Sequence, residues 1–390
     1  MTSDAQHSSS RPGPVGPAAG TTPTSGTTPT SASGRAASPE WDAVVVGGGA
    51  AGLAAALTLA RARRRVLVLD AGEPRNAPAA GVHGYLGREG TPPLELTRLG
   101  RAEVESYGGV VRSARVADVR RAGGDDADPT FSVTLAAVAD GTDASGGTVV
   151  AEATDASAAA LSPAEDAPET VTARRVVVAT GLVDDLPDVP GLAERWGRDV
   201  VHCPFCHGWE VRERRLGVLG SNPTAVHQAL LFRGWSDDVT LFVHDAPEPT
   251  DDEWEQLAAR GVQVVTGRVA GLVVEDDALT GVRLADGPVV AVDAVATSAV
   301  LRASDAVLEP LGLTAEPHPS GIATVVSADA VGRAAPGVWV AGNLADPMAQ
   351  VIAAAASGNR VGAAVVGDLL AAETRAAVAE RRARGIPDAR

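Results

Sequence analysis

Two stretches of the chain show the same order of apolar runs, and each predicts a unit of strand, helix and strand. In the first, residues 42–46 form an apolar, β-branched run, residues 50–63 have the composition and apolar spacing of a helix, and residues 65–69 form a second apolar run. Short apolar runs bounded by turn residues are typical of buried strands, and a period near 3.6 is typical of a helix. The folded part of the chain is therefore expected to begin with a βαβ unit near Trp41.

The pattern starts again at Arg215 and predicts a second unit of the same kind. Alternation of strands with helices indicates an α/β fold with parallel sheets. The chain is expected to return to its first domain near Leu301, so the second domain is inserted in the first. The further expected strands are residues 131–135, 171–178, 216–219, 239–243, 262–265 and 338–343, and the further expected helices are residues 224–235, 254–260 and 349–372.

Composition sets the expected domain boundaries. Residues 1–39 consist of Ser, Thr, Pro, Gly and Ala with almost no large apolar side chains, so we expect a disordered tail. Residues 137–170 are rich in small and acidic residues without periodicity, which indicates a solvated insertion. The first domain is expected over residues 40–197 and 301–375, the inserted domain over residues 198–300, and a polar tail over residues 376–390.

Charge limits the partners. The formal net charge of −16 argues against nucleic acid or an anionic membrane, because both bind basic faces. No secretory signal and no apolar stretch of membrane-spanning length are recognisable, so a cytoplasmic location in a reducing compartment is expected. A hydrophobic content of 45% with only 3% aromatics predicts aliphatic cores.

The first predicted turn has the glycine spacing of a dinucleotide-binding loop. Gly47 would make the tight turn, Gly49 would let the backbone approach a pyrophosphate, and Gly52 would let helix and strand pack closely. The phosphates would then lie on unpaired N–H groups at the start of the helix. Asp70 ends the next strand 18 residues beyond Gly52, where a carboxylate accepts hydrogen bonds from a ribose. The alternative for Asp70 is a solvated acid in an ordinary turn.

Cys203 and Cys206 are the only cysteines of the chain. Two cysteines cannot supply the four ligands of a structural zinc site, so no metal is expected, and a disulfide across so short a loop would stabilise the fold little. The spacing instead suits a reactive pair, in which one thiolate attacks a disulfide and the second thiol resolves the mixed disulfide. His202 and His207 flank the pair and could lower a thiol pKa or carry a proton, or could be loop histidines without such a role.

Three short motifs accompany these features. Val177–Gly181 ends a predicted strand with Ala-Thr-Gly, Ala341–Asn343 reads Ala-Gly-Asn, and Gln350–Val351 follows shortly afterwards. With a glycine-loop domain interrupted by a smaller domain that starts with Cys-x-x-Cys, residues 41–370 resemble the low-molecular-weight thioredoxin reductases, apart from the insertion. The resemblance implies two Rossmann-like, three-layer ββα domains, FAD in the first, and a homodimer formed through the FAD domains. It implies FAD-binding roles for Gly47, Gly49, Ala51, Gly52, Asp70, His83, Ala179, Gly181, Gly342, Asn343, Gln350 and Val351.

The resemblance also implies roles at the dithiol. Cys206 would face the flavin, Cys203 would exchange with substrate, and His207 would occupy the proton-donor position, which is an aspartate in typical thioredoxin reductases. The sequence Cys-Pro-Phe-Cys-His-Gly-Trp-Glu at residues 203–210 resembles a branch that includes flavin dithiol oxidases acting on small natural products with dioxygen. The segment that begins at His83 resembles the same branch, although His83 could equally be a loop histidine without a catalytic role.

The second glycine loop departs from the family pattern. Gly220 and Ala225 keep the first and third positions of the possible nicotinamide loop, but Asn222 replaces the middle glycine and would crowd a pyrophosphate. Where the family carries arginines for the 2′-phosphate of NADPH, this chain has Asp245, which would repel a phosphate. The choice between NADPH, NADH and neither stays open. Asn343 also departs from the family's aspartate, keeping an acceptor for the flavin ribityl chain but losing the charge.

Three functions are compatible with these residues. The first is an FAD-dependent reductase that passes electrons from NAD(P)H through the dithiol to an external disulfide, such as that of a thioredoxin-like protein. The second is a dithiol oxidase that closes a small-molecule disulfide with dioxygen as acceptor; a ferredoxin-dependent reductase is a related possibility. The third is a redox sensor, which the lack of a recognisable docking motif disfavours. Both enzymes imply rotation of the inserted domain about hinges near Arg198 and Ser298.

Overall fold

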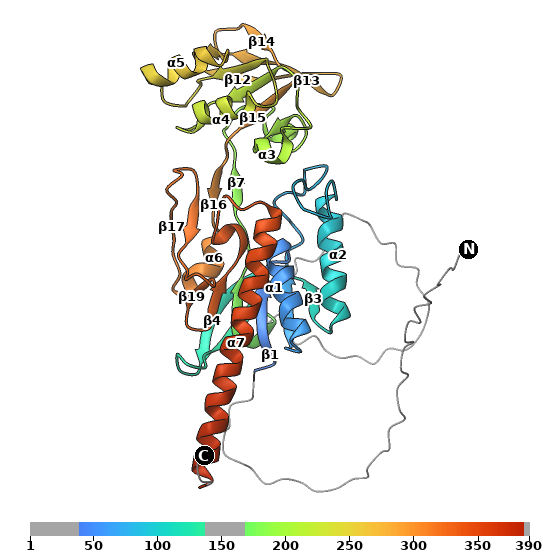
Figure 1. Ribbon diagram of the computed structural model, residues 1–390, viewed down its shortest axis with the longest axis vertical. Helices are drawn as coiled ribbons and strands as arrows, with labels where there is room; N and C mark the ends of the chain where they lie inside the picture. Colours follow the sequence, from blue (N-terminus) through green and yellow to red (C-terminus); the bar gives the residue numbers. More distant parts are fainter. Residues whose placement is uncertain (1–38, 137–167, 386–390) are drawn as a thin grey trace, which may run out of the picture. The chain divides into compact units, whose positions relative to one another are not determined.

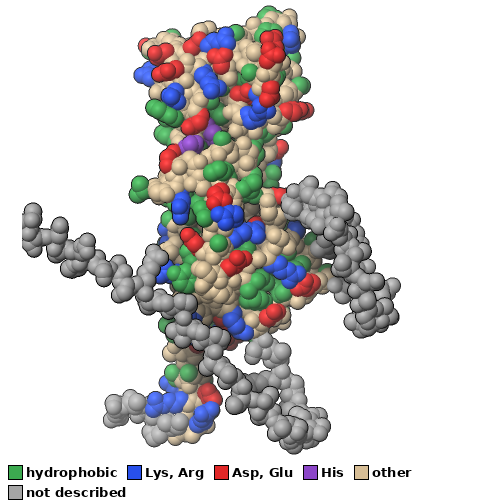
Figure 2. All heavy atoms as spheres, turned by 90° about the vertical axis from the view of Figure 1, so that its right-hand side faces the viewer, with side chains coloured by type: hydrophobic (Ala, Val, Ile, Leu, Met, Phe, Trp, Pro, Cys, Tyr) green, Lys and Arg blue, Asp and Glu red, His purple; other side chains and the backbone are tan. Residues whose placement is uncertain are grey.

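The computed structural model describes residues 39–136 and 168–385. The tail predicted over residues 1–39 and the insertion predicted over residues 137–170 therefore lie outside the described residues, except for their last residues. None of the described helices is long and apolar enough to cross a membrane. On the face shown in Figure 2, acidic and basic side chains of the described residues are interspersed, and no continuous basic patch gathers there.

The larger sheet has eight strands, and its path runs β19-β20-β6-β1-β2-β3, with the hairpin β4–β5 attached to β6. Strand β1 is parallel to both β2 and β6, and β20 returns from far along the chain to pair with β6. The bounds are β1 Trp41–Val46, β2 Val66–Asp70, β3 Val110–Ser113, β4 Val116–Gly123, β5 Thr130–Leu135, β6 Thr170–Val178, β19 Arg333–Ala335 and β20 Val338–Val340.

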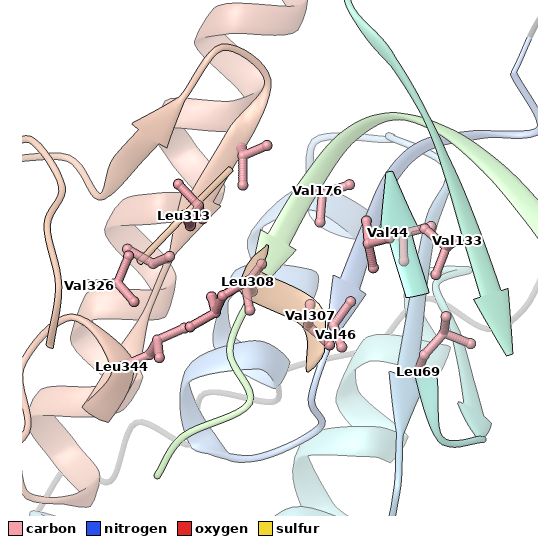
Figure 3. Close-up of a cluster of buried hydrophobic side chains, with 14 of the residues drawn as sticks. Val44, Val46, Leu69, Val133, Val176, Val307, Leu308, Leu313, Val326 and Leu344 are labelled. Carbon is pink, nitrogen blue, oxygen red and sulfur yellow. The ribbon is translucent and has the colours of Figure 1, made fainter. Parts of the chain in front are cut away.

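The two faces of this sheet belong to two different cores, because successive side chains of a strand point to opposite faces. Ala43 and Val45 pack with the helices α1 and α7. Val44 and Val46 pack on the other face with residues 307–344, as Figure 3 shows for part of that cluster. Both cores are mainly aliphatic, as predicted, and helix, sheet and β-rich cover form three layers. The helices of the first layer are α1 Ala50–Arg61, α2 Pro93–Ser106 and α7 Val351–Ala383.

Helices α1 and α7 lie side by side in Figure 1, and glycines allow their close contact. A Cβ atom added at Gly358 would lie 1.9 Å from the carbonyl oxygen of Ala51, and one at Gly362 would lie 2.7 Å from that of Ala55. Real Cβ contacts are never this short, so larger residues would separate the helices. The close contact holds the N-terminal ends of α1 and α7 together.

Between β6 and β19 the chain forms a second parallel sheet of five strands, ordered β11-β10-β9-β15-β8, and an antiparallel sheet, β12-β13-β14. The predicted fold class, an α/β fold with one Rossmann-like unit inserted in another, is confirmed. The strands β7 and β16 pair with each other on the way into and out of this region, as Figure 1 shows. The bounds are β7 Val183–Asp185, β8 Val200–Val201, α3 Pro204–His207, β9 Leu216–Leu219, α4 Ala225–Phe232, β10 Val239–Phe242, α5 Asp251–Ala259, β11 Gln263–Val265, β12 Val269–Glu275, β13 Ala278–Leu284, β14 Val289–Ala291, β15 Ala294–Thr297 and β16 Val300–Arg302.

Several helix boundaries differ from the prediction: α1 and α4 end two and three residues before the predicted ends at 63 and 235, and the differences at α5 and α7 have a local cause. Helix α5 begins at Asp251 because Thr250 and Glu253 form a reciprocal capping box, which places the start one turn before the apolar spacing suggests. Helix α7 continues to Ala383, so the polar tail predicted from residue 376 is helical over its first residues. Alanine, glutamate and arginine are strong helix formers, and Gly385, in a left-handed conformation with φ of 67°, follows the helix end.

Candidate functional site

A cavity of about 1070 Å³ brings the predicted cofactor residues and the dithiol together. It is lined from the carboxyl ends of β1 and β2, from the start of α7 and from the segment around α3. In open parallel sheets, ligands bind outside the carboxyl ends of the strands. Among the predicted residues, those that line it are Gly47, Gly49, Ala51, Asp70, His83, Ala179, Gly181, Cys203, Cys206, His207, Gly342, Asn343, Gln350 and Val351.

Of the three glycines of the first loop, two are closely packed and one borders open space. A Cβ atom at Gly47 would lie 2.4 Å from the carbonyl oxygen of Ala179, and one at Gly52 would lie 1.9 Å from that of Gly47. A Cβ atom at Gly49 would meet nothing within 4 Å. Gly52 is buried against the loop and is the one residue predicted to bind FAD that does not line the cavity. The backbone at Gly49 therefore faces the cavity at the uncapped start of α1, where a pyrophosphate can be bound.

Asp70 is paired within the protein. One carboxylate oxygen accepts a hydrogen bond from the amide of Gly48 at 3.0 Å, and the other is bonded to the guanidinium of Arg101. The side chain is 15% exposed, so it is not the solvated turn acid of the alternative interpretation. Its role toward a ribose stays a prediction. The sequence does not predict the contact with Arg101. Arg101 lies on α2, 31 residues beyond Asp70, so no short sequence motif links the two residues.

Asn343 holds the turn that leads into α7. Its amide nitrogen donates to the carbonyl oxygens of Asp346 at 3.2 Å, Pro347 at 3.2 Å and Ala349 at 2.9 Å. A carboxylate could make none of these bonds, because it has no donor. The departure from the family's aspartate therefore has a structural reason, and the amide oxygen remains an acceptor beside the cavity.

The two thiols differ in ionisation. Cys203 immediately precedes α3, and a hydrogen bond from the Cys206 thiol lowers the pKa of Cys203 to about 7. The same hydrogen bond, together with burial, raises the pKa of Cys206. The side-chain amide of Gln350, at the start of α7, lies 3.9 Å from Cys206 Sγ. At neutral pH Cys203 is therefore the more readily ionised thiol of the pair. Both thiols line the cavity, and the assignment of Cys206 to the flavin and of Cys203 to the substrate stays a prediction.

The three histidines near the dithiol are in different states. Among the described residues, both ring nitrogens of His207 are buried without a hydrogen-bond partner, and burial lowers its pKa. His202 is held with Nδ1 3.2 Å from the carbonyl oxygen of Thr297, and burial lowers its pKa as well. His83 Nδ1 lies 2.6 Å from a carboxylate oxygen of Glu89. No hydrogen bond joins the ring of His207 to either thiol, so its role in proton transfer stays a prediction.

The second glycine loop is apart from this cavity and is closed on itself. The side-chain oxygen of Asn222 accepts from the backbone N–H of Thr224 at 2.9 Å and from its hydroxyl at 2.6 Å. Pro223 has no N–H, and the amide of Ala225 donates to the carbonyl oxygen of Asn222 at 3.3 Å. Gly220 packs against the end of β10. Two donors that could hold a second pyrophosphate are therefore lost, since Pro223 has no N–H and that of Thr224 is already bonded.

Asp245 is paired with Arg268, a contact that the sequence does not predict. Arg268 binds its carboxylate through both terminal nitrogens, at 2.5 and 3.0 Å, and His244 Nε2 lies 3.2 Å from it. The arginine offsets the repulsion expected between Asp245 and a 2′-phosphate. Because the guanidinium of Arg268 is bound to the carboxylate of Asp245, Arg268 is not free to bind a 2′-phosphate as the arginines of the family do.

A family model for pyridine nucleotide-disulphide oxidoreductases matches residues 41–358. The thioredoxin reductase tcpT of Claviceps purpurea is 29% identical over 337 residues, which cover 85% of this chain and 94% of that protein. The thioredoxin reductase sirT of Leptosphaeria maculans is 30% identical over 222 residues, 54% of this chain and 58% of that protein.

Solved structures agree in fold. The crystal structure of HlmI has a TM-score of 0.75 and 43% identity, and covers 89% of this chain and 98% of its own. An oxidoreductase from Agrobacterium tumefaciens has a TM-score of 0.70 and 33% identity; the match covers 85% of this chain and 98% of that chain.

Among the described residues, no group of three or more His, Cys, Asp or Glu side chains is placed to hold a metal ion.

Proposed function

The chain belongs to the pyridine nucleotide-disulphide oxidoreductases, as a thioredoxin reductase-like flavoprotein, and on this premise we propose that it is a dithiol oxidase. Its substrate is a small-molecule dithiol, which is converted to the disulfide while dioxygen is reduced to hydrogen peroxide. The observation that carries the proposal is the second glycine loop, in which Pro223 has no N–H and the N–H of Thr224 is bonded to the side chain of Asn222, so that two donors for a nicotinamide dinucleotide are lost.

The cavity fits FAD. Its glycine loop leaves the backbone at Gly49 and the start of α1 open to a pyrophosphate, and Asn343 lines the same space. FAD, when bound, supplies a two-electron acceptor that dioxygen can reoxidise. Gln350, the residue before α7, contacts Cys206 and so sets the position of that thiol at the wall of the cavity.

The oxidised Cys203–Cys206 pair would undergo thiol–disulfide exchange directly with the substrate. A substrate thiolate attacks Cys203 Sγ of the oxidised pair, which breaks the Cys203–Cys206 bond and forms a mixed disulfide. The second substrate thiol then attacks the substrate sulfur of that bond and releases Cys203. The substrate loses two electrons and two protons, and the protein pair gains them. We assign the thiol proton to His207, whose ring is buried and has no hydrogen-bond partner of its own.

The surface beside the pair suits an apolar substrate. Phe205 lies between the two cysteines and is 62% exposed, and Trp209 is 65% exposed with the guanidinium of Arg212 4.0 Å from its ring centroid. Exposed aromatic side chains next to a reactive group favour the binding of a small apolar or planar molecule. A thioredoxin-like protein is the alternative substrate. The cytoplasmic location and the homodimer also stay predictions.

Anaerobic stopped-flow absorbance of the FAD-loaded protein tests the proposal. Dithiothreitol is expected to bleach the flavin, whereas NADPH and NADH leave it oxidised. Admission of dioxygen should then restore the flavin with one peroxide per disulfide formed. Rapid bleaching by either nicotinamide, with slow bleaching by the dithiol, would contradict the oxidase and favour an NAD(P)H-dependent disulfide reductase.

A further inference from the structure

Residues 82–91, between β2 and α2, form a short loop that is closed at its base and restrained inside. An antiparallel bridge joins the two ends of the loop. Inside it, one carboxylate oxygen of Glu89 lies 2.6 Å from His83 Nδ1, and the other accepts from the amide of Gly84 at 2.9 Å. Compact loops whose ends lie close together and whose own side chains fill them are frequently functional. These bonds fix the shape of the loop and of its tip, residues 85–88.

Two contacts hold this loop against the dithiol segment. A Cβ atom at Gly84 would lie 3.6 Å from Gln350 Oε1, and Gln350 Nε2 lies 3.9 Å from Cys206 Sγ. His83 Nε2 lies 3.5 Å from a carboxylate oxygen of Glu210, shortly after the second cysteine in the chain. The first contact is made with the residue before α7, and the second with the inserted domain. The loop of the first domain therefore lies beside the Cys-x-x-Cys segment.

The loop and the dithiol segment each expose a large apolar side chain. Leu86, at the tip of the loop, is 90% exposed, the largest exposed fraction among the large apolar side chains of the described residues. Trp209, in the turn after α3, is 65% exposed. The guanidinium of Arg212 lies 4.0 Å from the centroid of the indole ring and donates to the carbonyl oxygen of Trp209 at 2.6 Å. The arginine restrains the indole from one face, so a ligand can stack on the other.

We propose that Leu86 and Trp209 are specificity-determining residues, which bind the apolar part of the substrate while its thiols exchange with the Cys203–Cys206 pair. The inference rests on the proposed function and narrows its substrate class to a small dithiol with a flat, apolar skeleton. An indole ring prefers an offset stack with a planar partner, and a leucine adds apolar contact without needing a hydrogen bond. Because the backbone around both side chains is restrained, little conformational freedom is lost on binding.

The size of this surface also favours a small molecule. A stable protein–protein interface buries roughly 800 Å² on each partner. Leu86 and Trp209 are two side chains, and the charged groups beside them are already engaged within the protein: Glu89 and Glu210 with His83, and Arg212 with the indole. They leave an apolar contact of the size of a small ring system next to the reactive sulfurs.

Two dithiols with different skeletons test the site. Dithiothreitol and 1,2-bis(mercaptomethyl)benzene both close a six-membered cyclic disulfide, but only the second carries an aromatic ring. The anaerobic rate constant of flavin reduction is measured with each, and their ratio gives the preference for the apolar skeleton. In Leu86→Ser and in Trp209→Ser this ratio should fall about 10-fold, the lower end of what the loss of an apolar contact costs in selectivity. Trp209→Phe keeps a ring and should retain most of the wild-type preference.

Leu370→Ser is the matched control. Leu370 is 57% exposed on α7 and does not line the cavity, so the variant should keep the wild-type ratio. A second readout needs no electron transfer: calorimetric binding of the unreactive bis-methylthioether of the aromatic dithiol. Its affinity should fall by the same factor in both serine variants at the dithiol and stay unchanged in the control. Both positions are exposed, so the fold should be retained.

The outcomes separate this site from the proposed function. If the wild type is reduced, and Leu86→Ser and Trp209→Ser keep its ratio of rates and its affinity for the thioether, the site alone is overturned. If neither dithiol reduces the wild type, the dithiol oxidase is wrong. Weaker thioether binding by the two variants would then still support the site, and equal binding would overturn it. Faster bleaching by reduced thioredoxin than by the aromatic dithiol, slowed in Leu86→Ser, would show that the two side chains bind a protein and would overturn the small-molecule assignment.

Discussion

The two glycine loops of this chain have the same place in the same fold, between a buried parallel strand and a helix, yet they differ in what they leave open. The first leaves the backbone at Gly49 and the start of α1 facing a large cavity. The second is filled by the side chain of Asn222 and by Pro223. Asn222 and Pro223 thus remove two of the N–H donors that a loop of this kind offers to a phosphate. The comparison teaches that retention of a Rossmann-like fold does not imply retention of its ligand.

The largest effect is expected at the dithiol, which lies on the wall of the open loop's cavity. Cys203→Ser removes the thiol that attacks and is attacked, so turnover of dithiothreitol with dioxygen should fall more than about 1000-fold. Cys206→Ser should abolish turnover equally but allow Cys203, when a small disulfide is supplied, to attack it, release one thiol and keep a stable mixed disulfide. Oxygen consumption measures the first effect, and intact-protein mass spectrometry measures the second. Persistent turnover of Cys203→Ser would show that electrons reach the flavin without the pair.

The open loop itself is tested by Gly49→Val. The added side chain points into the cavity without touching protein atoms, so the fold should persist while the approach of the pyrophosphate is obstructed. Loss of a charge-assisted hydrogen bond costs about 1.5–3 kcal/mol, which corresponds to about 10- to 150-fold weaker FAD binding. Fluorescence titration of the apoprotein with FAD measures it. Asn222→Gly, in the closed loop, is the matched control and should bind FAD as the wild type does.

The closed loop is tested by Asn222→Gly in the nicotinamide assay. Removal of the amide frees the N–H of Thr224 and clears the approach of a pyrophosphate. One recovered hydrogen bond of about 1–1.5 kcal/mol should speed reduction by NADH about 10-fold, with a smaller gain for NADPH because Arg268 is occupied by Asp245. Stopped-flow bleaching at 450 nm, near the usual flavin maximum, reports it. If reduction stays as slow as in the wild type, the loop is not what excludes the nicotinamide.

The sequence predicts the local parts of this comparison and misses the parts made by distant residues. The glycine spacing, the strands on either side and the Cys203–Cys206 pair are local patterns, and all are found in the structure as expected. Arg101 beside Asp70 and Arg268 beside Asp245 come from elements that only folding brings near, and an exposed-looking arginine gives no signal of its partner. The conformation of the second glycine loop could be predicted only in part. Asn222 was identified as crowding, but its Asx-type hydrogen bonds to Thr224 depend on the turn that the chain adopts.

The smallest effect is expected at Gln350, which links the start of α7 to the dithiol. Its side chain stabilises the thiolate form, so it contributes to the lowered pKa of Cys203 of about 7. Alkylation by iodoacetamide follows the thiolate, and its rate in the wild type should rise through pH 7 and level off above it. Gln350→Ala should move this rise to higher pH by less than about 1 unit, because the hydrogen bond from Cys206 remains the main cause. A rise near pH 8.5, the value of an ordinary cysteine, would mean that the two thiols do not share a proton in solution, and the assignment of Cys203 as the exchanging thiol would lose its support.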